Sequence, residues 1–153
     1  MQEKAKQLFI LLLFLVASVF QVYLHWLLIL YTNSSLYDFY EGILMVVSVL
    51  VNLYGCVCLY LKNVVCLNIL MALQFVILFA NLCVLAIINS AGFKGGYSSR
   101  LYALEDSQGS DVAQKYIDYF WRTFYLTYAA KALIVIGLIW TIFYYRKMVL
   151  NKK

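Results

Sequence analysis

The stretch LFILLLFLVASVFQVYLHWLLILY, residues 8–31, is a run of nearly uninterrupted apolar residues. The hydrocarbon core of a bilayer is about 30 Å thick and takes about 20 apolar residues of α-helix. The run is long enough to cross it, and it lacks the alternating polarity of a strand in a membrane β-barrel. It also lacks the small-residue cleavage pattern of a signal peptide, so we expect a retained transmembrane helix.

Three further apolar runs cover residues 43–61, 64–88 and 126–145. The composition agrees, because 65% of the residues are hydrophobic and 12% are charged, against about 45–50% and about 25% in soluble domains. We therefore predict an all-α membrane protein, in which residues 1–153 form a single domain of four transmembrane helices in an antiparallel bundle. Residues 90–125 then form an outer loop. Its last part, from Ser110 or Asp111, is expected to be helical and either to lie on the membrane surface or to continue into the fourth span.

The distribution of basic residues predicts the orientation of the chain, because cytoplasmic flanks of membrane spans are rich in lysine and arginine. With the N-terminus in the cytoplasm, the inner segments carry more basic residues than the outer ones, and Glu41 falls in an outer loop. We therefore expect both termini to be cytoplasmic. The inner basic residues are Lys4, Lys6, Lys62, Arg146, Lys147, Lys152 and Lys153, and the outer ones are Lys94, Arg100, Lys115 and Arg122.

The expected partners follow from the same distribution of charge. The net charge of +5 is explained by this topology and by attraction to anionic inner-leaflet lipids. The segments outside the spans contain no patch of basic and aromatic residues of the kind that binds nucleic acid. We expect the partners to be membrane lipids and other integral membrane proteins, with no nucleic acid.

A sequon at Asn33-Ser34-Ser35 falls in the predicted first outer loop. Asn33 is therefore a candidate N-glycosylation site. A multi-pass protein of the plasma membrane or an endomembrane fits this feature best, and another organelle membrane is the alternative.

Three cysteines gather around the predicted inner turn in GCVCLYLKNVVC, residues 55–66. A structural zinc site needs four ligands, commonly from CxxC pairs or histidine. Here the spacing is CxC, and the only histidine of the sequence, His25, lies on another predicted helix. We therefore expect no metal site. A redox pair is normally CxxC beside a base. Cysteines next to the cytoplasmic surface are instead candidates for S-acylation, here Cys56, Cys58 and Cys66. The alternative is that they are small apolar packing residues.

The same residues give the chain a family resemblance. Gly55-Cys56-Val57-Cys58, followed by Lys62-Asn63 and Cys66-Leu67, resembles the GCCG-type motif, short charged turn and cysteine between the second and third spans of tetraspanins. The order of short and long loops is also similar, although the segment 91–122 lacks the cysteines of the CCG motif that tetraspanins carry in their large loop. Other four-span families with the same loop proportions are a looser match. The resemblance implies a four-span fold and a role in organising other membrane proteins.

Polar side chains within the spans are costly in hydrocarbon unless they find partners. Gln21, Asn52 and Gln74 fall near the bilayer midplane on three different helices. We expect these three amides to form hydrogen bonds between the helices.

A second polar set, His25, Ser48, Asn81 and Lys131, lies in the outer half of the spans. Lys131 either extends its charged group to the surface or lines, with the other three, a polar cleft that is open outward. The cleft would take a lipid headgroup or an acidic group of a partner, because this chain is expected to place no acid at that depth. No serine, cysteine or carboxylate completes a catalytic set with His25, so we expect no catalytic residues, no cofactor and no enzymatic activity.

These observations favour a non-enzymatic membrane organiser or scaffold that acts by lateral association, as tetraspanins do. The alternative is a small accessory subunit in a hetero-oligomer such as a channel, a receptor or a respiratory assembly. A third class, a small transporter or channel, would need several copies of the chain to form a pore.

Overall fold

The computed structural model describes residues 2–32, 35–88 and 110–151. Over these residues the chain forms the helices α1 (Gln2–Thr32), α2 (Ser35–Leu61), α3 (Val64–Ile88) and α5 (Ser110–Leu150), and it contains no strand there. The predicted all-α class is confirmed for this part of the chain. α5 begins at Ser110 and continues without a break through the fourth apolar run.

Each of these helices contains a segment that is long and apolar enough to cross a membrane. The protein is therefore a multi-pass membrane protein, and its described residues contain four candidate spans, as the sequence predicts. The candidate spans are Lys4–Leu28, Phe39–Leu61, Val64–Ala86 and Trp121–Leu150.

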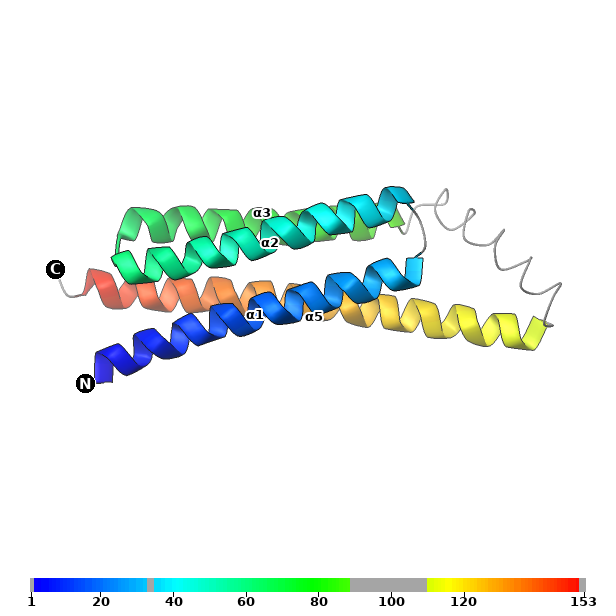
Figure 1. Ribbon diagram of the computed structural model, residues 1–153, viewed down its shortest axis with the longest axis horizontal. Helices are drawn as coiled ribbons and strands as arrows, with labels where there is room; N and C mark the ends of the chain where they lie inside the picture. The colour runs from blue at the N-terminus through cyan, green and yellow to red at the C-terminus, as the bar shows by residue number, and fades with distance from the viewer. Residues whose placement is uncertain (1, 33–34, 89–109, 152–153) are drawn as a thin grey trace.

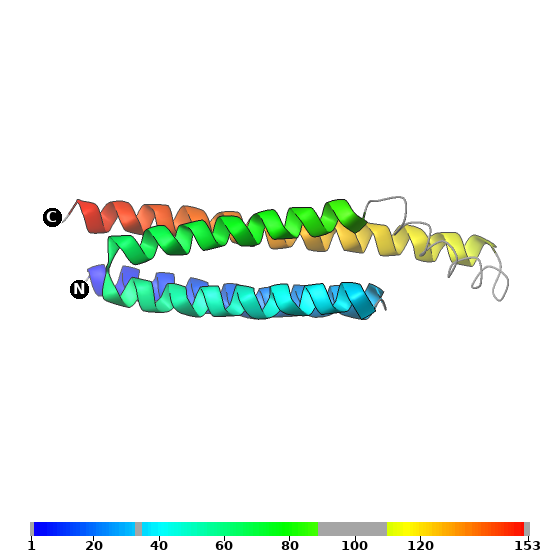
Figure 2. The same cartoon turned by 90° about the horizontal axis from the view of Figure 1, so that it is seen from above.

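The four helices form a bundle in which α1 packs beside α2 and α3 packs beside α5 (Figures 1 and 2). Contacts between α2 and α3 and between α1 and α5 close the ring. The start of α1, the end of α5 and the α2–α3 turn all lie at one end of the bundle, which we call the turn end (Figure 1). The opposite end, where α1 and α3 finish, is called the loop end.

The α2–α3 turn consists of Lys62 and Asn63. Lys62 has φ 52°, the left-handed conformation in which many helices end. The Asn63 side-chain oxygen accepts a hydrogen bond from the backbone N–H of Val65 at 2.9 Å, which caps the first turn of α3. Because the connection is so short, α2 and α3 must be neighbours in the bundle.

The backbone carbonyl of Leu59 joins three helices at the turn end. It lies in the last turn of α2, where carbonyl groups have no partner within the helix. It accepts hydrogen bonds from the Gln7 side-chain amide of α1 at 2.9 Å and from the Tyr145 hydroxyl of α5 at 3.1 Å. These bonds hold α1 and α5 against the end of α2.

The bundle interior is apolar at both ends. A large cluster extends from the turn end toward the middle, and a smaller one of Leu28, Phe124 and Tyr128 closes the loop end. Large apolar side chains cover the outer faces, as expected for a surface that meets lipid. The large cluster contains Ile10, Phe14, Ala17, Val51, Cys58, Leu59, Leu67, Leu70, Ile77, Val135, Leu138, Ile142 and Tyr145.

Candidate functional site

Buried polar side chains occupy the bundle interior from its middle toward the loop end. They come from the inward faces of the helices, as their spacing indicates: His25 lies four positions after Gln21, and Ser48 lies seven positions after Glu41. The set comprises Gln21, His25, Glu41, Ser48, Asn52, Gln74, Asn81, Thr127 and Lys131, all of them buried.

Three amide side chains form a hydrogen-bonded chain across α1, α2 and α3. The Asn52 side-chain nitrogen donates to Gln21 Oε1 at 2.8 Å, and the Gln74 side-chain nitrogen donates to Asn52 Oδ1 at 2.9 Å. Asn52 is thus both donor and acceptor, and it lies between Gln21 and Gln74 in this amide chain. The structure brings together the three residues that the sequence places near the midplane.

Substitution of Gln74 is expected to show how much this amide chain contributes. Gln74→Leu removes the side-chain N–H group that donates to Asn52 Oδ1. The loss of this hydrogen bond should lower the free energy of unfolding by about 0.6–2 kcal/mol. Gln74→Glu should cost more, because it places a carboxyl group in hydrocarbon without a cation at that depth in the described helices. The measurement is unfolding in detergent micelles.

Asn68, an exposed amide on the same helix, provides matched controls. Asn68→Leu and Asn68→Asp should both have small effects. Equal stability of Gln74→Leu, Gln74→Glu and the parent protein would show that the amide chain does not hold the helices together.

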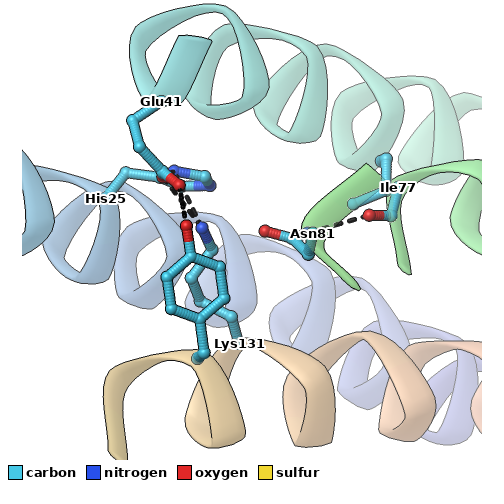
Figure 3. Close-up of polar contacts among 6 residues, drawn as sticks. His25, Glu41, Ile77, Asn81 and Lys131 are labelled. Carbon is cyan, nitrogen blue, oxygen red and sulfur yellow. Dashed lines mark hydrogen bonds and ion pairs between the residues drawn. The ribbon is translucent and has the colours of Figure 1, made fainter. Parts of the chain in front are cut away.

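A cluster of ionisable side chains lies on the loop-end side of the amide chain. Figure 3 shows its members Glu41, His25 and Lys131, which come from three helices. Lys131 Nζ of α5 donates to Glu41 Oε2 of α2 at 2.9 Å, and His25 Nδ1 of α1 lies 2.5 Å from the same oxygen. The Tyr128 hydroxyl donates to Glu41 Oε1. Glu41 and Lys131 are 0% and 1% exposed, so this ion pair is buried. The pair connects α2 and α5, which face each other diagonally across the bundle.

Glu41 is the acceptor for all three of its neighbours. A carboxylate has only acceptor sites, so we assign the proton of the facing His25 nitrogen to Nδ1. Lys131 Nζ lies 3.3 Å from the same nitrogen and 4.6 Å from the centre of the Tyr128 ring. The ammonium group therefore contacts the carboxylate and an aromatic face at once, which offsets part of the cost of burying its charge.

Glu41 corrects two expectations from the sequence. It was expected in an outer loop, and no acid was expected at the depth of Lys131. In the structure α2 begins at Ser35, so Glu41 is already helical, faces the interior and binds Lys131. Lys131 therefore does not extend to the surface, because its charge is balanced inside the bundle.

The expected outward-open cleft is also corrected. His25, Ser48, Asn81 and Lys131 are all buried, because the cluster of Leu28, Phe124 and Tyr128 lies between them and the loop end. Figure 3 shows the Asn81 side chain directed toward the Glu41–Lys131 pair, while its nitrogen donates back to the Ile77 carbonyl at 2.9 Å. Among the described residues, Asn81 Oδ1 and the Ser48 hydroxyl have no hydrogen-bond partner. The four residues line a closed polar interior.

The cysteines at the turn end differ in their exposure. Cys58 is buried in the large apolar cluster, whereas Cys56 and Cys66 are half-buried at its edge. The described cysteines are all free thiols. Within the described ranges no group of three or more His, Cys, Asp or Glu side chains is placed to hold a metal ion. The candidate glycosylation site, Asn33, lies outside the described residues.

The polar side chains of the interior link the helices through hydrogen bonds and an ion pair. The amide chain links α1, α2 and α3, and the carboxylate of Glu41 links α1, α2 and α5. Sequence reasoning missed Glu41 and Tyr128. Their signal was helical spacing, because Glu41 lies seven residues before Ser48 and Tyr128 three before Lys131, on the same helix faces.

No protein-family model, no curated protein and no solved structure matches this chain. These comparisons do not confirm the resemblance to tetraspanins, which rests on the residues around the α2–α3 turn and on the order of short and long loops.

Proposed function

We propose that this protein is a non-enzymatic integral membrane organiser, tetraspanin-like, that acts by lateral association with other membrane proteins. The observation that supports this function best is the pairing of Glu41 with Lys131, His25 and Tyr128 inside one chain. Because this carboxylate has its partners in the same bundle, the fold does not need a second protein to neutralise it. The apolar outer faces then remain available for lipid and for neighbouring spans.

The proposed orientation is an antiparallel bundle with both termini in the cytoplasm. The short Lys62–Asn63 turn and the position of the helix ends in Figure 1 support the antiparallel order. The turn end also carries the basic residues Lys4, Lys62 and Lys147, and basic flanks favour the cytoplasmic side.

Purification from native membranes tests the proposed function. A tagged chain should purify alone and folded in a stringent detergent, and in a mild detergent it should bring several membrane proteins in amounts below one per chain. The accessory-subunit alternative requires a fixed stoichiometry with one set of subunits and loss of folding when the chain is alone. That result would replace the proposal.

Variants on one outer face sharpen this experiment. Phe75 and Phe79 are exposed on α3, and replacing both by Ala should reduce recovery of partners that bind this face without changing stability. The matched control is the same double replacement at Phe20 of α1 and Phe39 of α2, which are exposed on other helices. Identical partner recovery for the parent and both variants would contradict lateral association through these faces.

S-acylation is expected at Cys56 or Cys66 and not at Cys58. An acyl chain on Cys58 would require a buried thiol to leave the core, whereas the other two lie at the edge of the bundle. Hydroxylamine-sensitive acyl exchange should be lost in Cys56→Ser/Cys66→Ser and retained in Cys58→Ser. Cys83→Ser, which changes a half-buried cysteine elsewhere on α3, is the control. An unchanged acyl signal in the double variant would reject acylation here.

A further inference from the structure

A groove opens between α1 and α5 near the turn end. Figure 1 shows α1 diverging from α5 toward this end, and the space between them has a volume of about 600 Å³. Its walls include Phe9 and Leu13 of α1 and Trp140 and Tyr144 of α5, with Lys6 at the turn end.

The walls of the groove match a hydrocarbon chain. All of its lining residues lie within the candidate membrane spans Lys4–Leu28 and Trp121–Leu150, so the groove faces lipid. Thr141, a polar residue of the lining, donates its hydroxyl to the Gly137 carbonyl at 2.8 Å. That proton is therefore used within α5, and most of the remaining surface is aromatic or aliphatic.

The turn-end mouth of the groove is positively charged. Lys6 lines the groove and is exposed. Lys147 follows Tyr144 by three residues on α5, about 4.5 Å along the helix axis and on the same face. A basic pocket between membrane helices is suited to an anionic lipid headgroup.

We propose that the α1–α5 groove is a binding site for an anionic glycerophospholipid. One acyl chain lies between Phe9 and Trp140, and the headgroup phosphate contacts Lys6. Tyr144 lies between these two parts of the lipid, at the depth where aromatic side chains meet the interface. The site does not depend on which side of the membrane the turn end faces.

Trp140 is a natural probe of this site because it lines the groove and is exposed. A variant with Trp26→Phe and Trp121→Phe retains Trp140 as the only tryptophan. The variant is placed in phosphatidylcholine vesicles with increasing fractions of brominated phosphatidylglycerol or brominated phosphatidylcholine. Bromine quenches tryptophan fluorescence on contact. The anionic lipid should quench at a mole fraction about fivefold lower than the neutral lipid.

Two lysines of α1 give a matched pair of variants on this background. Lys6→Gln should remove most of the preference for the anionic lipid, because of these two lysines at the mouth of the groove, Lys6 and Lys147, only Lys147 then remains. Lys4→Gln should leave it intact, because Lys4 is exposed at the same end but does not line the groove. Both positions are on the surface, and circular dichroism checks that the helices remain.

A filled groove and a distant tryptophan complete the test. Ala5→Leu occupies part of the groove and should reduce quenching by both lipids. A variant with Trp26 alone, near the loop end, should show no preference for the anionic lipid. Equal quenching of Trp140 by the two lipids, equal loss from Lys4→Gln and Lys6→Gln, or the same preference at Trp26 would each overturn the proposal.

Discussion

Replacement of Glu41 by Leu is expected to lower the free energy of unfolding by about 3–5 kcal/mol, the typical cost of breaking a buried ion pair. The reason is that Glu41 accepts from three donors, so its loss leaves Lys131, His25 and Tyr128 without their shared acceptor. Lys131 is 1% exposed, and its ammonium group would remain in a nonaqueous interior. Unfolding in detergent micelles, followed by circular dichroism, measures this effect.

Lys131→Met should destabilise less than Glu41→Leu. In that variant the carboxylate keeps the Tyr128 hydroxyl and the His25 ring as donors. Exposed groups serve as controls: Asp111→Leu and Lys147→Met should change stability by no more than about 0.5 kcal/mol. If Glu41→Leu were no more destabilising than Asp111→Leu, the buried cluster would not exist in the folded protein.

Gly55→Ala is expected to lower the free energy of unfolding by about 1–3 kcal/mol, although alanine normally favours a helix. A Cβ atom at Gly55 would lie 2.5 and 2.7 Å from two ring atoms of Phe14 and 3.3 Å from Leu70. Phe14 is fully buried, so its ring cannot move aside without separating α1 from α2. Thermal unfolding in the same detergent measures the loss.

Two other glycines are matched controls for this substitution. Gly42 and Gly137 are also helical, and a Cβ atom at either would have nothing within 4 Å. Gly42→Ala and Gly137→Ala should therefore be neutral or stabilising by up to about 1 kcal/mol. Phe14→Leu removes the ring atoms that collide, so combining it with Gly55→Ala should cost less than the sum of the two single changes. Three equal effects at the three glycines would contradict the close approach of α1 and α2.

The four helices of the described residues and their membrane-spanning character were predictable, because both follow from long apolar runs. The start of α2 was harder to place, because an apolar run is normally taken to end at its first charge. Glu41 breaks this rule for a tertiary reason: its partner comes from α5, ninety residues later in the chain. A sequence pattern within one helix cannot identify a partner that lies 90 residues away in the sequence.

The amide chain was easier to predict than the ionic cluster. Gln21, Asn52 and Gln74 lie at similar depths in uninterrupted apolar runs, and an amide in hydrocarbon needs a partner. Their order, with Asn52 in the middle, depends on the ring arrangement of the helices and so required the structure. The close contact of Gly55 with the Phe14 ring also required the structure, because Phe14 lies on another helix.

The pairing of Glu41 with Lys131 within one chain can be measured by a double-mutant cycle. The free energies of unfolding of Glu41→Leu, Lys131→Met and the double variant are compared with that of the parent in one detergent. The double variant should be more stable than the sum of the single effects predicts, by at least about 1 kcal/mol, because neither charge is then left unpaired. Effects that add to within about 0.5 kcal/mol would show that Glu41 and Lys131 do not interact in the folded protein.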